Sequence, residues 1–131
     1  MRKILIDTNV YVAFKRNQTN IVNIFQNVDF IGLNLTVLAE LYAGFKGGNQ
    51  ESHNRSGLEE FMNNPRVHFI KSTKETAHFY AHVFSILKKK GTPIPTNDIW
   101  IAASAMQTGL SMVSLDKHFQ HIDGLMIWND H

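Results

Sequence analysis

The sequence predicts an α/β fold, a three-layer α/β/α sandwich in which helices cover both faces of a central parallel sheet of about five strands. The prediction rests on the order of the expected elements and on a general rule of sheet topology. Short runs of branched apolar residues, which are typical of buried strands, alternate with longer segments whose apolar residues recur at helical spacing. Strands that alternate with helices usually pair in parallel, because each helix returns the chain to the same end of the sheet.

The first half of the chain contains two of the expected strands and four of the expected helices. The strands cover residues 3–6 and 30–33. A short helix is expected over residues 10–15, and two further helices are expected to be capped by Thr19 and Thr36. A polar, glycine-rich break over residues 44–49 then separates the third helix from a fourth, which ends near Asn64 and Pro65.

The second half is expected to begin with a strand over residues 67–70 and a long helix over residues 74–90 that Gly91 ends. Pro93 and Pro95 give an extended connection to a helix over residues 98–108, for which Asn97 is the expected cap. The remaining elements are, in order, a strand over 111–114, a helical turn over 117–121 and a last strand over 125–127.

Length and composition indicate a globular protein, with residues 1–131 expected to form a single domain. Apolar residues make up 44% of the chain and charged residues 18%, which excludes a disordered chain. The absence of cysteine excludes disulfides and thiolate metal sites. The N-terminus has only three apolar residues before Asp7, too few for a signal peptide, and the longest apolar-and-small run, residues 99–106, is far shorter than a membrane span. We therefore expect a cytoplasmic protein without a membrane partner.

Four acidic residues are expected to meet at one edge of the sheet. Asp7 and Asp116 each follow a strand, Asp98 opens a helix, and Glu40 lies in the first two turns of the helix after the second strand. Carboxylates this close repel one another unless a divalent cation lies between them, and oxygen-only ligands select Mg²⁺ or Mn²⁺. The side chain of Asn9, one turn after Asp7, is a candidate to orient Asp7 or a water molecule.

The distribution of charge is compatible with a polyanionic substrate. Four of the 11 acidic side chains belong to the expected metal site, which leaves seven against 13 basic side chains in the rest of the chain. A basic shell around an acidic pocket suits a polyanionic substrate held by cations. Lys15 and Arg16 follow the Asp7 turn and are candidates for phosphate contacts.

Four motifs support a more specific interpretation: Ile6-Asp7-Thr8-Asn9-Val10; Ala39-Glu40-Leu41 with Gly44; Asp98 with Ile101-Ala102-Ala103 and Ala105; and Ser114-Leu115-Asp116 with Phe119. Together, and in this order, they resemble the PIN-domain nucleases, in particular the toxin ribonucleases of the VapC type. The resemblance implies a PIN-like fold and a Mg²⁺-dependent endoribonuclease. It also implies that Asp7, Glu40, Asp98 and Asp116 are the catalytic metal ligands, with Ser114 as the supporting hydroxyl.

The same resemblance implies the toxin of a type II toxin–antitoxin pair, a homodimer that cleaves structured RNA such as a tRNA or rRNA loop and is paired with a small antitoxin. Two alternatives remain open at this stage, an RNA-processing PIN nuclease outside a toxin pair and a non-catalytic dimerising PIN module. Many relatives carry a further acid where this chain has His118, which leaves open whether one or two metal ions bind. His118 and His121 could assist near the metal, but they are interpreted first as surface or partly buried residues.

Overall fold

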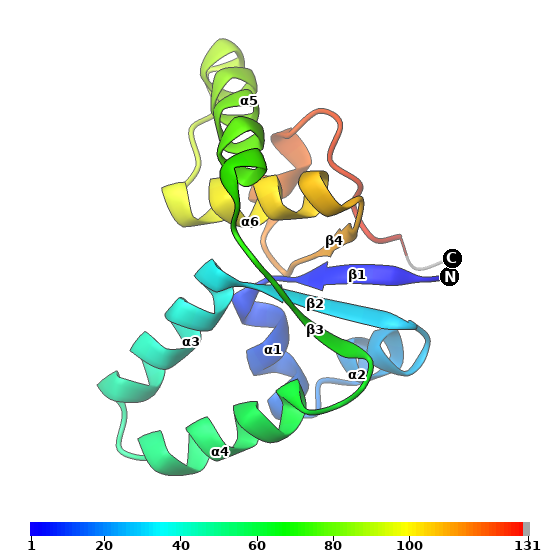
Figure 1. Cartoon of the computed structure of the whole chain (residues 1–131), viewed down its shortest axis with the longest axis vertical. Coiled ribbons are helices and arrows are strands. Elements are labelled where there is room, and N and C mark those ends of the chain that lie inside the picture. Colours follow the sequence, from blue (N-terminus) through cyan, green and yellow to red (C-terminus); the bar gives the residue numbers. More distant parts are fainter. Residues whose placement is uncertain (130–131) are drawn as a thin grey trace.

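A parallel sheet of four strands lies at the centre of the computed structural model, which describes residues 1–129 (Figure 1). The strands are β1 (Lys3–Ile6), β2 (Phe30–Asn34), β3 (Val67–Ile70) and β4 (Ser111–Val113). Their order across the sheet is β3-β2-β1-β4, and each neighbouring pair is parallel.

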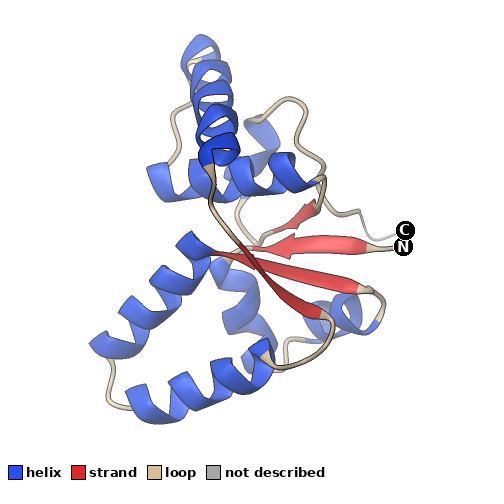
Figure 2. Cartoon of the chain, in the orientation of Figure 1, coloured by secondary structure: helices blue, strands red, loops and turns tan. Residues whose placement is uncertain are grey.

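Helices cover both faces of this sheet. They are α1 (Thr8–Lys15), α2 (Thr19–Gln26), α3 (Leu35–Gly47), α4 (Glu51–Met62), α5 (Lys74–Lys90) and α6 (Thr96–Thr108), followed by the short 3₁₀ helix η1 (Lys117–His121). Figure 1 and Figure 2 show α5 and α6 on one face and α1 to α4 on the other. The predicted three-layer α/β/α arrangement is therefore confirmed.

Strand β1 is the innermost part of the molecule. Ile4, Leu5 and Ile6 are completely buried, and the strand pairs with β2 on one side and with β4 on the other. The chain runs from β1 outward through β2 to β3 and then returns across the sheet to β4, so the strand order reverses between β1 and β4. Ligands of open α/β sheets bind at such a reversal, beyond the carboxyl ends of the strands.

The prediction of a fifth strand over residues 125–127 is wrong, because these residues do not form a regular strand. These residues do lie in parallel beside β4, where Met112 and Ile127 form an isolated bridge. The Met112 N–H donates to the carbonyl of Met126 at 2.8 Å, and the Trp128 N–H donates to the carbonyl of Met112 at 2.9 Å. These two hydrogen bonds do not continue into a longer β-ladder, because β4 itself is only three residues long.

Helix ends also differ from the predictions at four N-termini and one C-terminus. Helix α1 begins at Thr8, two residues before the predicted start. The N-cap positions are Gln18, Asn34 and Pro95 in place of Thr19, Thr36 and Asn97. Helix α3 continues through Gly44 to Gly47, because one glycine lowers helix stability without ending the helix. The predicted end of α5 is confirmed, since Gly91 adopts a left-handed conformation with φ of 67°.

Asn34 joins the two layers of helices. It is the last residue of β2 and is completely buried. Its Oδ1 accepts a hydrogen bond from the Val37 N–H at 2.9 Å and so caps α3. Its Nδ2 donates to the hydroxyl of Ser104 at 3.1 Å and to the carbonyl of Trp100 at 3.4 Å, both in α6. One side chain therefore fixes the start of α3 against α6 across the end of the sheet.

No helix among residues 1–129 is long and apolar enough to cross a membrane.

We predict that Asn34→Ala lowers the free energy of unfolding by about 2–3 kcal/mol, because it removes the cap of α3 and leaves Ser104 without its buried partner. Asn34→Ser keeps a capping oxygen and should cost less. Urea unfolding of the two variants, with the exposed Asn63→Ala as control, checks this. Equal stability of Asn34→Ala and Asn63→Ala would contradict the assigned role.

Candidate metal centre

Asp7 lies at the carboxyl end of β1, where it is the N-cap of α1 and only 5% exposed. Its Oδ1 accepts a hydrogen bond from the Thr8 N–H at 2.8 Å, and its Oδ2 accepts one from the Ser114 hydroxyl at 2.7 Å. Burial raises the pKa of Asp7, an effect that these two hydrogen bonds oppose and that the charges of Asp98 and Glu40 reinforce.

Glu40 reaches the same edge of the sheet from the second turn of α3. Its Oε1 accepts a hydrogen bond from the Thr8 hydroxyl at 2.6 Å, and its Oε2 accepts one from Asn97 Nδ2 at 3.3 Å. Thr8 is the chain neighbour of Asp7, and Asn97 is the chain neighbour of Asp98. These two polar side chains therefore link Glu40 to the segments that carry two other acids.

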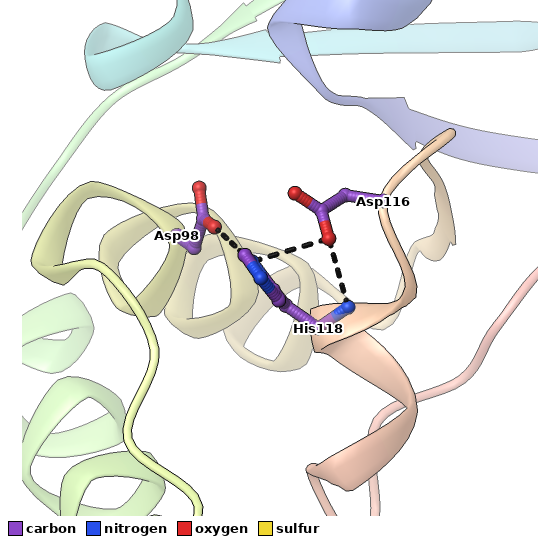
Figure 3. A group of neighbouring side chains, drawn as sticks. All are labelled: Asp98, Asp116 and His118. Carbon is purple, nitrogen blue, oxygen red and sulfur yellow. Dashed lines mark hydrogen bonds and ion pairs between the residues drawn. The ribbon is translucent and has the colours of Figure 1, made fainter.

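Asp98 and Asp116 approach each other from the first turn of α6 and from the N-cap of η1, with His118 between them (Figure 3). His118 Nδ1 lies 3.1 Å from Asp98 Oδ2 and 3.1 Å from Asp116 Oδ1. Burial raises the pKa of Asp98; the hydrogen bond with His118 opposes this shift, and the charge of Asp116 adds to it. Phe119, which is buried in the core, anchors η1 and so keeps His118 on this side.

The four predicted acids form one electrostatic group. The charges of Asp98 and Glu40 act on Asp7, and the charges of Asp116 and Glu40 act on Asp98. Partly buried anions that repel one another are stabilised by a divalent cation. The donor set fits such an ion, because carboxylate oxygens suit hard cations and because ligand atoms of Asp98, Asp116 and His118 lie within 4.8 Å of one another.

The two supporting residues have positions that the sequence did not fully predict. The Ser114 hydroxyl donates to Asp7 and accepts a hydrogen bond from the Asp116 N–H at 2.9 Å, so it joins two of the acids. Asn9 was a candidate to orient Asp7 or a water molecule; in the structure its Oδ1 accepts a hydrogen bond from the Leu115 N–H at 3.2 Å. Asn9 therefore holds the loop after β4, which carries Asp116.

Three polar residues of the site were missed by sequence reasoning. Thr8 and Asn97 adjoin two of the predicted acids, and that adjacency is the only signal that pointed to them. His118 was expected to be a surface or partly buried residue, and it is partly buried, but its contacts with both Asp98 and Asp116 were not predicted. The first turn of η1 directs the imidazole of His118 towards Asp116, and the spacing of residues in the sequence does not predict this geometry.

Lys15 and Arg16 lie away from the four acids. Asp7 caps the N-terminus of α1, and Lys15 and Arg16 lie at its other end, roughly 12 Å away along the helix axis. Both line a cavity of about 510 Å³ between α1, α3 and α4, whose wall also includes His53 and Glu60. Their contact with RNA stays a prediction, and it requires a substrate that extends well beyond the metal centre.

Comparison with known proteins gives a consistent result. The family model described as PIN domain matches residues 4–125. The chain is 31% identical over 132 residues to Ribonuclease VapC2 of Haemophilus influenzae, with 98% of each chain covered. It is similar to a chain in the crystal structure of VapBC2 from Rickettsia felis bound to a promoter DNA fragment, with a TM-score of 0.85, 26% identity and coverage of 97% and 98%. A chain of DNA-bound VapBC from Salmonella typhimurium gives a TM-score of 0.86, 26% identity and 98% coverage of each chain.

We predict that Asp7→Asn raises the melting temperature by a few degrees at pH 7 in the presence of a chelator. The raised pKa means that the folded protein binds the proton of Asp7 up to a higher pH than the unfolded chain does. The free energy of unfolding therefore falls as the pH rises from about 4 through the raised value, and stays lowered above it. An Asn side chain does not ionise, so Asp7→Asn avoids this loss of stability. The difference in melting temperature between the variant and wild type should therefore vanish below about pH 4.

Melting curves of wild type and variant across this pH range measure the difference directly. Asp98→Asn should behave in the same direction, because the pKa of Asp98 is also raised. Asp29→Asn, which replaces an exposed acid outside the centre, serves as the control. A lower melting temperature for Asp7→Asn than for wild type at pH 7 would contradict the electrostatic account.

Proposed function

Because the chain belongs to the PIN domain family, we propose that it is a metal-dependent endoribonuclease that acts as the toxin of a VapB–VapC type pair. Relatives that align over nearly its whole length are named ribonucleases. The observation that carries the proposal is the convergence of acids from four separate segments at the point where the strand order reverses.

Asp7, Glu40, Asp98 and Asp116 are the proposed catalytic residues and would hold the cation, with Mg²⁺ as the proposed ion and Mn²⁺ as a substitute. When bound, a divalent cation supplies an activated water and stabilises the charge that develops on the phosphoryl group. The side chains of Thr8, Asn97 and Ser114 hold the carboxylates in fixed directions. This support matters because a metal centre depends on the orientation of its ligands.

The proposed substrate is a structured RNA with an accessible loop, such as a tRNA or rRNA loop. The acids lie on rigid elements, so selectivity is expected to come from the shape of the RNA and from its unpaired bases. Thirteen Lys and Arg residues provide cations for the phosphates, among them Lys15 and Arg16 beyond the centre. We further propose a cytoplasmic homodimer that a small antitoxin protein controls.

We predict that purified protein cleaves susceptible RNA only with a divalent cation, and that Asp7→Asn lowers the cleavage rate at least about a hundredfold. A metal centre contributes several kcal/mol to the transition state, which corresponds to a loss of this size. Gel analysis of end-labelled RNA, with Asp29→Asn as the active control, measures the rate. Cleavage that persists in excess EDTA would contradict the metal-dependent mechanism.

We predict that expression of the chain alone arrests growth and produces discrete new RNA 5′ ends, whereas Asp7→Asn does neither. Recognition of loop shape at a rigid site should restrict cleavage to a few positions. Mapping of 5′ ends shortly after induction tests this. Discrete new ends without growth arrest would favour an RNA-processing nuclease, and normal growth without new ends, from folded protein, would favour a non-catalytic module.

A further inference from the structure

His118 occupies a position that the four-acid scheme does not explain. Its Nδ1 is within 3.1 Å of one carboxylate oxygen of Asp98 and within 3.1 Å of one of Asp116 (Figure 3). The backbone N–H of His118 also donates to Asp116 Oδ1 at 3.0 Å, which fixes the acid and the imidazole relative to each other. The ring therefore lies between the two acids, while 44% of its side chain remains exposed.

The spacing of these atoms is that of ligands around one small cation. Ligands at about 2.1 Å from an octahedral ion lie about 3 Å apart when they occupy adjacent positions. Both Nδ1–oxygen separations have this value, and the three ligand atoms all lie within 4.8 Å of one another. The same separations also fit a hydrogen bond donated by Nδ1, so the two roles must be separated by experiment.

We propose that His118 is itself a ligand of the cation that Asp98 and Asp116 hold, a role that rests on the metal centre of the proposed function. Nδ1 binds the ion through its lone pair, and the ring proton is then on Nε2.

A nitrogen ligand changes which ion the centre prefers. Mg²⁺ favours oxygen ligands and releases its waters reluctantly, whereas imidazole suits transition-metal ions. His118 therefore raises the affinity for Mn²⁺ relative to Mg²⁺, compared with a centre built from carboxylates alone. The inference concerns metal selectivity, which is measured without RNA.

Electron spin echo spectroscopy of the Mn²⁺-loaded protein detects a directly bound imidazole nitrogen. We expect the nitrogen modulation in wild type and in His121→Ala, which removes an exposed histidine of the same short helix. We expect its loss in His118→Ala and in His118→Asp. Circular dichroism on each variant confirms that the fold is retained.

Calorimetric titrations with Mn²⁺ and Mg²⁺ provide the second measurement. His118→Ala should weaken Mn²⁺ binding at least about tenfold and Mg²⁺ binding by a smaller factor. His118→Asp should restore binding of both ions with a lower preference for Mn²⁺ than wild type shows. Mn²⁺ binding by wild type without nitrogen modulation, or unchanged selectivity in His118→Asp, would overturn the proposal, as would the absence of Mn²⁺ binding.

These outcomes are distinguishable from failure of the proposed function. Nitrogen modulation in a protein that cleaves no RNA would count against the ribonuclease and leave the ligand role of His118 intact. Metal-dependent cleavage by a protein without nitrogen modulation would overturn the role of His118 alone.

Discussion

Burial of the Asp7 carboxylate at the end of β1, beside other carboxylates, is the constraint on which the rest of the site depends. Asp7 is almost completely buried, and the charges of Asp98 and Glu40 both act on it. Unpaired anions at such a depth destabilise a fold, so the surrounding residues have to offset that cost. Hydrogen bonds from the Thr8 N–H and the Ser114 hydroxyl offset part of it for Asp7. A bound cation would offset the rest of this cost. The acids are therefore already positioned as ligands in the absence of the ion.

The scaffold brings these acids together through its topology. Strand β1 is central, and the reversal of strand order beside it brings the end of β1 against the end of β4, where the Asp7 N–H donates to the carbonyl of Val113 at 3.0 Å. The other two acids come from helices on opposite faces of the sheet. Asn34 bonds the start of α3 to α6, so the helix of Glu40 and the helix of Asp98 cannot shift independently. Rigid support of this kind keeps ligands within the tolerance that a metal centre requires.

Sequence patterns predicted the architecture, and the common direction of parallel strands placed Asp7 and Asp116 at one edge. Glu40 and Asp98 were expected at the same edge only because each lies near the start of its helix. Sequence patterns failed where a contact depends on tertiary geometry. Asn34 and Thr36 are both residue types that cap helices, with Asn the stronger of the two, and the fold shows that Asn34 caps α3. His118 looks like any partly exposed histidine until the turn of η1 places its ring between Asp98 and Asp116. Residues 125–127 have strand-like composition, but the short β4 offers them a single bridge.

The central claim is that Asp7, Glu40, Asp98 and Asp116 surround one site for a divalent cation. An anomalous difference map from crystals grown with Mn²⁺ tests it most directly, because the map locates the ion without reference to activity. The account predicts a strong peak at the carboxyl ends of β1 and β4, between Asp7, Asp98 and Asp116. A map in which Mn²⁺ binds only elsewhere, with the Asp98 and Asp116 carboxylates still joined through His118 as in Figure 3, would contradict it.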